Sequence, residues 1–208
     1  MCDELGEGGR RRKVRHFWER KYGACREGAG LSLLSCKRSE EMAKTHLFHN
    51  LQKVTLSSTA TVDDFIIMAL HCWEYLVCFR AGDERWNFIG DKICEYDDLI
   101  NYKGKFYAVD KVGRTLVVGS HTLSVTLGAN TIANDHRQKH LVESNGDLFL
   151  VDVHYRLPCK DCVGVFLGCK VFRLDEKERQ WVQVGNLRNA VFLVDWQRSY
   201  SLPGCDLP

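Results

Sequence analysis

The stretch NYKGKFYAVDKVGRTLVV, residues 101–118, decides which fold the sequence predicts. It reads as a β-hairpin, because short turns that contain glycine separate its apolar runs. A strand that covers a core on one side alternates apolar and polar residues. Here Phe106 and Ala108 lie on one face and Tyr107 and Val109 on the other, so both faces are apolar. The stretch therefore predicts strands that are buried on both faces.

Short β-rich runs of this kind continue from about Val54 onward, with turn residues between them. One turn, Asn145-Gly146, is a strong hairpin signal, because a type I′ turn needs a positive φ at both central positions. The predicted fold class is therefore all-β. The pattern predicts strands at residues 64–69, 75–79, 85–89, 99–102, 105–109, 115–118, 140–143, 147–153, 170–174, 181–184 and 191–195.

Two pairs of segments resemble each other within the chain. The segment LVCFRAGDERWNFIG (76–90) resembles CKVFRLDEKERQWVQVG (169–185), and YKGKFYAVD (102–110) resembles ESNGDLFLVD (143–152). The tryptophans of the first pair lie 95 positions apart, and the turn glycines of the second pair lie 42 apart. If the longer interval holds two repeats, both suit a four-stranded propeller blade of about 40–50 residues. Because a blade lies between two neighbouring blades, its central strands are buried on both faces.

The predicted architecture is a partial β-propeller of four-stranded antiparallel blades with a flexible N-terminal tail. Residues 1–45 are rich in glycine and charge, so we expect a disordered tail. Its basic run RRRK, residues 10–13, is either a solvated charged segment or a nuclear-import signal. Residues 46–208 have room for about three to four blades of ~45 residues. The side chains assigned to the core are Trp86, Phe106, Tyr107, Val109, Phe149, Val151, Trp181 and Phe192.

Composition and charge argue against several classes of protein. The net charge of the 208 residues is +2, so no global basic field favours nucleic acid or an anionic membrane. The longest apolar stretch, residues 65–79, is interrupted by His71 and Glu74 and is too short and polar for a membrane span. A basic and aromatic mixture at residues 10–18 is too short to predict a nucleic-acid interface. The ten cysteines are scattered, which is typical of reduced thiols in the cytoplasm or nucleus.

The segments DDFIIMAL, GDERW, YKGKFYAV, LVESNGDL and YSLPGC occur in this order along the chain. Together they resemble the plant KIB-type β-propeller domain, a domain of unknown function in F-box and kelch-like proteins. The resemblance covers about residues 47–205. It implies a non-enzymatic propeller that recognises a partner protein. In many members an N-terminal F-box docks a Skp-type adaptor, so that the propeller serves as the substrate receptor of a ubiquitin ligase.

The sequence departs from the family pattern at both ends. Residues 1–45 show no F-box, whose helices would give a long amphipathic period, so a Skp-type adaptor is not an expected partner. The chain stops soon after LPGC (202–205), where relatives run on into a final strand. We therefore expect a protein-interaction module without an F-box of its own, in a shortened gene product. The alternative is a truncated product with no independent function.

A cysteine cluster gives another alternative function. Cys159, Cys162 and Cys169, with His154 and Cys205 farther away, are residues of the types that bind tetrahedral zinc. A strong zinc signature needs a second well-spaced pair, which the sequence lacks, so a turn with reduced thiols is the competing interpretation. The alternative is therefore a zinc-binding or enzymatic propeller that uses this region. No other cofactor is expected.

Two acidic pairs resemble the paired carboxylates of acid–base catalysis. Adjacent strand residues point to opposite faces, so Asp63-Asp64 and Asp97-Asp98 are not expected to converge on one substrate. Turn formation and strand entry are the roles expected for them.

Some polar and aromatic residues are expected at the surface. The basic segment NDHRQKH (134–140) reads as a loop, so His136 and His140 are expected to be solvent-exposed. Trp73, Trp196 and the loop at residues 135–139 are candidates for a protein-binding face. Ordinary packing within a blade is the competing role for the two tryptophans.

Overall fold

The computed structural model describes residues 51–57, 64–71, 75–89, 95–132, 138–156, 165–195 and 198–204. All of these stretches lie in one compact unit, Ala43–Pro208. Every element of regular secondary structure among them is a β-strand, which confirms the all-β prediction. None of them holds a helix that is long and apolar enough to cross a membrane. The predicted tail, residues 1–45, lies outside the described residues.

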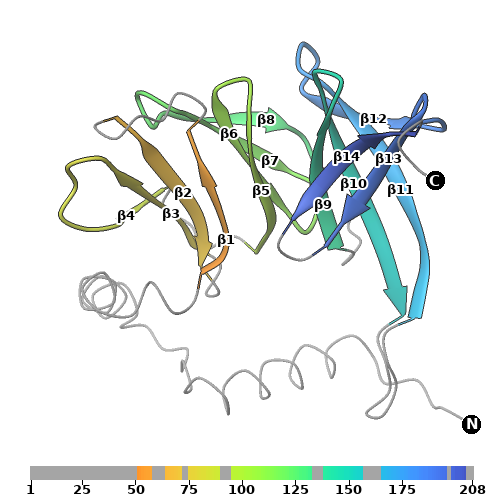
Figure 1. Cartoon of the computed structure of the whole chain (residues 1–208), viewed down its shortest axis with the longest axis horizontal. Coiled ribbons are helices and arrows are strands. Elements are labelled where there is room, and N and C mark those ends of the chain that lie inside the picture. Colours follow the sequence, from red (N-terminus) through yellow and green to blue (C-terminus); the bar gives the residue numbers. More distant parts are fainter. Residues whose placement is uncertain are drawn as a thin grey trace, which may run out of the picture. The chain divides into compact units, whose positions relative to one another are not determined.

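Three four-stranded antiparallel sheets follow one another along the chain, and we call them blades 1, 2 and 3 (Figure 1). In each blade the strands pair in the order in which the chain forms them. Blade 1 consists of β1 (Leu51–Leu56), β2 (Ile66–His71), β3 (Tyr75–Arg80) and β4 (Asn87–Phe88). Blade 2 consists of β5 (Tyr96–Tyr102), β6 (Lys105–Asp110), β7 (Thr115–Gly119) and β8 (Val125–Ala129). Blade 3 consists of β9 (Gln138–Ser144), β10 (Asp147–Arg156), β11 (Val165–Asp175) and β12 (Gln180–Val184).

A two-stranded antiparallel sheet follows blade 3, and we call it the β13–β14 hairpin (Figure 1). It consists of β13 (Ala190–Val194) and β14 (Ser199–Pro203). The first strands of successive blades are neighbours, since β1 packs against β5, and β5 against β9. β14 in turn packs against β9. These strands form the inner side of a blade-by-blade arrangement, as a propeller requires.

The strand β6 lies within residues 101–118, the stretch predicted to be apolar on both faces. Both faces of β6 are buried. Phe106, which is 0% exposed, lies in an apolar cluster with Met68 of blade 1. Tyr107, which is 4% exposed, lies in a different cluster with Leu148 of blade 3. Blade 2 is therefore packed between its two neighbours. Burying a side chain such as Phe106 contributes about 1.5–3 kcal/mol to stability.

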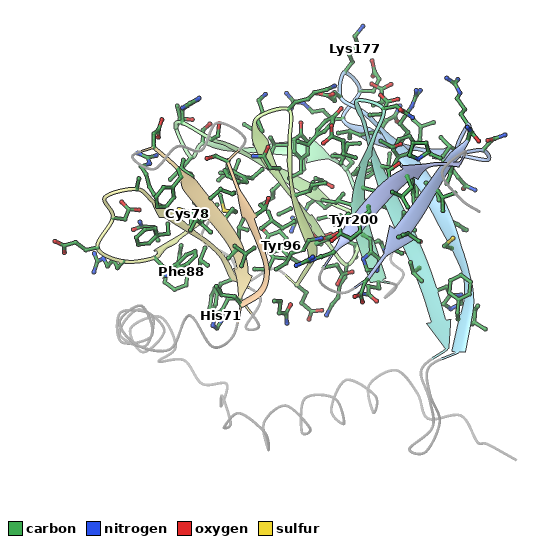
Figure 2. The ribbon with its side chains drawn as sticks, in the orientation of Figure 1. His71, Cys78, Phe88, Tyr96, Lys177 and Tyr200 are labelled. Carbon is green, nitrogen blue, oxygen red and sulfur yellow. The ribbon has the colours of Figure 1, made fainter. Side chains whose placement is uncertain are left out.

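The cluster between blades 1 and 2 also holds a cysteine. Cys78 of β3 is completely buried in it and makes no disulfide (Figure 2). Burial raises the pKa of its thiol to about 11, so the sulfur stays protonated at neutral pH. Cys78 thus acts as a small apolar residue of the core.

The internal repeats occupy equivalent places in two blades. Residues 76–90 span β3 and β4 of blade 1, and residues 169–185 span β11 and β12 of blade 3. The other pair of segments holds the turns that join the first two strands of blades 2 and 3. In these turns Lys103, Gly104, Asn145 and Gly146 all have a positive φ, between 48° and 79°. Positive φ at both central positions is the type I′ pattern that the Asn-Gly pair predicts.

Three strands of the structure were not predicted: β1, β8 and β14. Two of them contain a residue that normally argues against a strand, namely Gly128 in β8 and Pro203 in β14. Gly128 lies so close to β7 that a Cβ atom there would be 2.4 Å from Cγ2 of Val117. Close approach of β7 therefore explains the glycine. Pro203 is the last residue of its strand. Its missing N–H therefore removes no hydrogen bond from the middle of the sheet.

Candidate functional site

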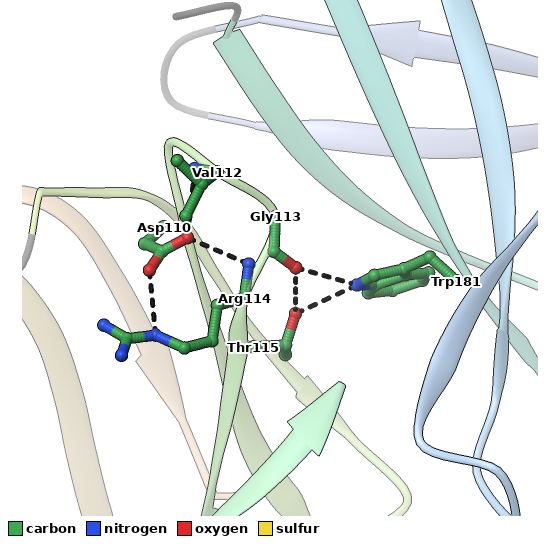
Figure 3. A network of polar contacts seen from close by, with 6 residues as sticks. All are labelled: Asp110, Val112, Gly113, Arg114, Thr115 and Trp181. Atoms are coloured by element: carbon green, nitrogen blue, oxygen red, sulfur yellow. Dashed lines mark hydrogen bonds and ion pairs between the residues drawn. The ribbon is translucent and has the colours of Figure 1, made fainter. Parts of the chain in front are cut away.

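The turn between β6 and β7 holds a network of polar contacts that joins blades 2 and 3 (Figure 3). The carboxylate of Asp110 accepts hydrogen bonds from the backbone N–H groups of Val112 (3.1 Å) and Arg114 (2.9 Å), and from Nε of Arg114 (3.1 Å). These bonds fix the turn, which is the role expected of an aspartate at this position.

The same turn accepts a tryptophan from the next blade. Nε1 of Trp181, in β12, donates to the backbone oxygen of Gly113 (3.0 Å) and to Oγ1 of Thr115 (3.2 Å). Thr115 is completely buried and Trp181 is only 7% exposed. The indole therefore both buries apolar surface and has hydrogen-bond acceptors for its N–H. It links blade 3 to blade 2. This network is structural.

A second polar cluster lies where the inner strands meet, and it begins with Asp97 and Asp98 of β5. Leu141 donates its backbone N–H to Oδ2 of Asp98 (2.7 Å), and Lys139 donates its backbone N–H to Oδ2 of Asp97 (3.0 Å). Both carboxylates thus reach β9, so the expectation that they point apart is wrong. The reason is a β-bulge, since the register of β5 against β6 shifts between Tyr96 and Asp98. A bulge turns neighbouring side chains toward one side.

Asp98 also joins blade 1 to blade 2. Its Oδ1 forms an ion pair with Nζ of Lys53, which lies in β1. The side chain of Asp98 is 2% exposed and that of Lys53 is 12% exposed, so water screens this pair little. The carboxylate of Asp98 therefore links β5 to both β1 and β9.

Lys139 and Asp152 form the most deeply buried ion pair among the described residues. Nζ of Lys139 lies 2.9 Å from Oδ1 of Asp152, and their side chains are 1% and 5% exposed. The two residues face each other on β9 and β10 of blade 3. The expectation that residues 135–139 form an exposed protein-binding loop is therefore wrong for Lys139, while residues 135–137 lie outside the described part of the chain.

His140 is buried as well, with 3% of its surface exposed. Burial lowers the pKa of its imidazole, and the carboxylate of Asp98 acts in the opposite direction. The expectation of a solvated His140 is therefore wrong, whereas His136 lies outside the described residues. The basic residues of the segment 134–140 suggested a loop, but the residues from Gln138 onward form the inner strand β9.

Asp97 is a carboxyl group whose titration is shifted by its surroundings. Burial raises its pKa to about 6, although the backbone N–H of Lys139 and the charge of Lys111 favour the ionised form. Folded chains therefore hold the proton of Asp97 more tightly than unfolded chains, in which an aspartate titrates near 3.9. The stability that follows from this difference is present below pH of about 4 and is lost as the pH rises through about 6.

Replacing Asp97 by asparagine is therefore expected to flatten the fall of stability with pH. Asparagine keeps an oxygen that can accept the Lys139 N–H, but it carries no charge to desolvate. We expect Asp97→Asn to be more stable than the native chain by roughly 2 kcal/mol at pH 7 and about equal to it at pH 4. Urea unfolding at several pH values measures this difference. Glu143→Gln, at an exposed position of β9, is the control. If the free energy of unfolding changed equally with pH in all three proteins, the prediction would be contradicted.

The inner-strand cluster is best explained as structural, because Asp97 and Asp98 link neighbouring blades and Lys139 and Asp152 join two strands of blade 3. Its carboxylates are held by backbone N–H groups and lysines, and Asp98, Lys139 and Asp152 are almost completely buried. A substrate would have to displace these contacts to reach them. Asp64, of the other acidic pair, is exposed before β2, and Asp63 lies outside the described residues.

The cysteine cluster is described only in part. Cys169 is an exposed, free cysteine of β11 and His154 is exposed on β10, whereas Cys159, Cys162 and Cys205 lie outside the described residues. Among the residues that are described, no group of three or more His, Cys, Asp or Glu side chains is placed to hold a metal ion. Zinc binding by Cys159, Cys162 and Cys169 stays a prediction.

Most of the aromatic and aliphatic residues assigned to the core are deeply buried. Phe149 of β10 and Phe192 of β13 are half-buried, and their ring centroids lie 5.2 Å apart. This contact fastens the β13–β14 hairpin to blade 3. Trp73 and Trp196 lie outside the described residues. The others are at most 7% exposed: Trp86, Phe106, Tyr107, Val109, Val151 and Trp181.

The β13–β14 hairpin exposes an apolar surface that the sequence analysis did not single out. Leu193 and Tyr200 are cross-strand partners and are 50% and 47% exposed. Val191 and Leu202 form the next pair on the same face and are half-buried. We call these four residues the hairpin face. Its signal in the sequence is the uninterrupted run AVFLV (190–194), which is apolar on both faces although only one face contacts blade 3.

Comparison with known proteins agrees with the fold. The model of a family described as the KIB1-4 beta-propeller matches residues 25–208. No solved structure matches the chain.

The curated relatives are F-box proteins of Arabidopsis thaliana. F-box protein At2g17036 is 32% identical over 157 residues, which is 70% of this chain and 39% of the relative. F-box protein SKIP23 is 30% identical over 159 residues, 69% of this chain and 39% of the relative. F-box/kelch-repeat protein At1g64840 is 28% identical over 135 residues, 64% of this chain and 35% of the relative. The matched segment thus spans well under half the length of each of these relatives.

Proposed function

Because the chain belongs to the KIB1-4 β-propeller family, we propose that it is a protein-recognition module of the kind that selects substrates in F-box ubiquitin ligases. The family and the F-box relatives support a role in protein interaction. The chemistry of the described residues fits this role, since the buried charged groups join blade 1 to blade 2 and stabilise blade 3 from within. We expect the protein to act by binding in the cytoplasm or nucleus, without catalysing a reaction.

The hairpin face is the observation that carries the proposal. It presents two large apolar side chains, Leu193 and Tyr200, directly opposite each other on a sheet whose other face is packed against blade 3. Exposed contiguous apolar residues mark interaction sites. Tyrosine is enriched at such sites because it offers a large apolar ring with a polar tip.

Affinity capture with matched variants tests the proposal. Leu193→Asp/Tyr200→Asp is expected to lose a stoichiometric partner that the native chain retains, because two charges would have to be buried without partners. The control is Val125→Asp/Leu127→Asp on β8, where the replaced side chains are 42% and 36% exposed. Circular dichroism checks that both variants are folded. Partner binding that survives in the hairpin variant, or that is lost equally in both, would contradict the proposal.

Substrate recognition is the finer part of the proposal and needs its own measurement. We expect the captured partner to bind the matching segment of F-box protein SKIP23 as well, and the native chain to compete with that relative for it. The partner's ubiquitination in plant cells should then change when the native chain is expressed, but not when the hairpin variant is. Unchanged ubiquitination would limit the function to binding.

A further inference from the structure

The β13–β14 hairpin covers only half of the face of blade 3 on which it lies. One row of side chains across this face runs through Val142 of β9, Phe149 of β10, Arg173 of β11 and Val182 of β12, as the strand registers show. Val142 is completely buried and Phe149 packs against Phe192 of the hairpin. Arg173 and Val182, in contrast, are exposed, Val182 to 42%. The hairpin thus covers β9 and β10 and leaves β11 and β12 covered only in part.

The next row repeats this division. His140 of β9 and Val151 of β10 are buried, at 3% and 4% exposure. Val171 of β11 and Val184 of β12 continue the row and are only half-buried. We call the partly covered half of the face, formed by Val171, Arg173, Val182 and Val184, the β11–β12 floor.

Two hollows border this floor. One of about 230 Å³ is lined by Val171 and Val184 together with Leu187, where the chain leaves β12 toward β13. The other, of about 280 Å³, is lined by Arg173 and Val182 near the β11–β12 turn. The floor is therefore an indented strip beside the hairpin, with valines along it and polar side chains around it.

The strand β13 borders the floor with backbone groups that its own sheet does not use. Gly204 donates its N–H to the oxygen of Asn189 (2.6 Å), and Asp195 donates its N–H to the oxygen of Arg198 (2.8 Å). In an antiparallel pair every second residue bonds to the partner strand, so these two bonds assign residues 191 and 193 to β14. The N–H and C=O groups of Phe192 and Val194 consequently point away from β14. No strand in the described part of the chain pairs with that edge of β13.

We propose that an extended segment of a partner protein binds here, as a third strand on the outer edge of β13 that lies over the β11–β12 floor. This inference rests on the proposed protein-recognition function and states how the partner is held. The backbone of the segment bonds to Phe192 and Val194, and every second side chain points to the floor. The three complete blades have four strands each, so a strand at this place continues an arrangement that the fold already uses.

Charge at the floor favours an acidic segment. Asp175 accepts hydrogen bonds from the backbone N–H groups of Lys177 and Glu178 in its own turn, and Glu176 is paired with Lys103. Arg173 is half exposed and lies 3.6 Å from Asp147, and Lys177, which forms no ion pair with another residue in the described stretches, projects from the β11–β12 turn (Figure 2). The partner segment therefore alternates apolar residues with at least one carboxylate near Arg173.

A second copy of this chain does not fit as the added strand. Antiparallel pairing of β13 with its own copy needs a two-fold axis perpendicular to the sheet. Such an axis places both copies of blade 3 on the same side of the joined sheet. The blade 3 of the second copy would then occupy the space of β11 and β12. The occupant is therefore a single extended segment.

A synthetic peptide tests the site without knowledge of the natural partner. The probe is the acetylated and amidated hexapeptide VTVTET, whose valines and glutamate share one face as an extended strand. Titrated into the full isotope-labelled chain, it is expected to shift the NMR amide signals of β11 to β13, those of Phe192 and Val194 most. N-methylation of the valines and glutamate removes donors that face β13, and is expected to weaken binding about fivefold for each lost hydrogen bond. N-methylation of the threonines alters the other edge and should leave binding unchanged.

Protein variants supply the second arm. Val182→Asp places a charge on the floor and is expected to abolish the peptide-induced shifts, whereas Val125→Asp, at a position of β8 with the same 42% exposure, retains them. The absence of shifts with the native chain, or equal effects of the two N-methylated peptides, would overturn the inference. So would slow hydrogen exchange at Phe192 and Val194 in the free protein, because another segment would then already occupy the edge. Partner capture that depends on the hairpin face but not on Val182 refutes this inference and leaves the proposed function intact.

Discussion

Replacing Lys139 by methionine is expected to lower the free energy of unfolding by about 3–5 kcal/mol. The ammonium group lies 2.9 Å from a carboxylate oxygen of Asp152, and both side chains are at most 5% exposed. Methionine has a similar length but no charge, so Asp152 would stay in the interior without its counter-ion. A buried carboxylate that loses its lysine either bears a larger desolvation cost or takes up a proton, and both outcomes destabilise the fold at neutral pH.

Urea unfolding of purified protein at pH 7 measures this loss. The double variant Lys139→Met/Asp152→Leu removes both charges and is expected to recover most of the stability, because an apolar pair of similar volume often replaces a buried ion pair. Arg173→Met is the matched control, since Arg173 and Asp147 form a pair in which both side chains are about half exposed. Such a pair contributes at most about 1 kcal/mol. A Lys139→Met variant as stable as the control would show that the buried pair does not hold blade 3 together.

Replacing Trp181 by alanine is the second change with a large expected effect, again about 3–5 kcal/mol. The indole is 7% exposed, packs in the cluster between blades 2 and 3, and donates to the turn at Gly113 and Thr115. Alanine would leave a cavity between the blades and would remove the 3.0 Å hydrogen bond to the Gly113 oxygen, which would keep the longer bond from Oγ1 of Thr115 (3.3 Å). Because the contact links two blades, we expect cooperative unfolding to be weakened along with stability.

Calorimetry distinguishes the two contributions of this tryptophan. Trp181→Phe keeps most of the apolar surface but removes the donor, and should cost about 1–3 kcal/mol. Val182→Ala, at the neighbouring exposed position, should change stability by no more than about 0.5 kcal/mol. If Trp181→Phe and Trp181→Ala were equally destabilising, the hydrogen bonds to Gly113 and Thr115 would dominate over packing. If neither changed stability, the proposed link between blades 2 and 3 would be wrong.

The two-sided apolar pattern predicted the fold because a propeller blade packs on both faces, and so the neighbouring residues of one strand are apolar on both faces. Phe106 and Tyr107 are neighbours in the chain, and they enter separate apolar clusters on opposite sides of blade 2. The turn glycines Gly104 and Gly146 indicated the length of a blade because they recur at equivalent places. Each occupies a type I′ turn that needs a positive φ. These signals involve residues close in sequence, so they can be read without a structure.

The polar cluster was predicted poorly because it depends on contacts between distant strands. Lys139 and His140 lie in a segment whose charged residues are typical of a loop. In the fold, Lys139 pairs with the distant Asp152, and His140 interacts with Asp98 and Asp195. The convergence of Asp97 and Asp98 arises from a β-bulge, which is a property of the ladder with β6. No spacing rule within one strand reveals that bulge.

The uncovered surfaces were missed for a related reason. The run AVFLV (190–194) has the same two-sided apolar pattern as the interior strand β6, so sequence alone assigns it to a core. Whether a neighbouring sheet covers each face depends on the arrangement of blade 3 and the hairpin. In the structure one face meets Phe149, and Leu193 on the other face is 50% exposed.

Hydrogen–deuterium exchange of the chain with and without its captured partner tests the central claim most directly. If the chain recognises a protein through the hairpin face and the β11–β12 floor, binding should slow exchange in β11, β13 and β14 and leave β1 to β4 unchanged. Protection confined to blade 1, or no protection in the complex, would contradict this assignment of the recognition surface.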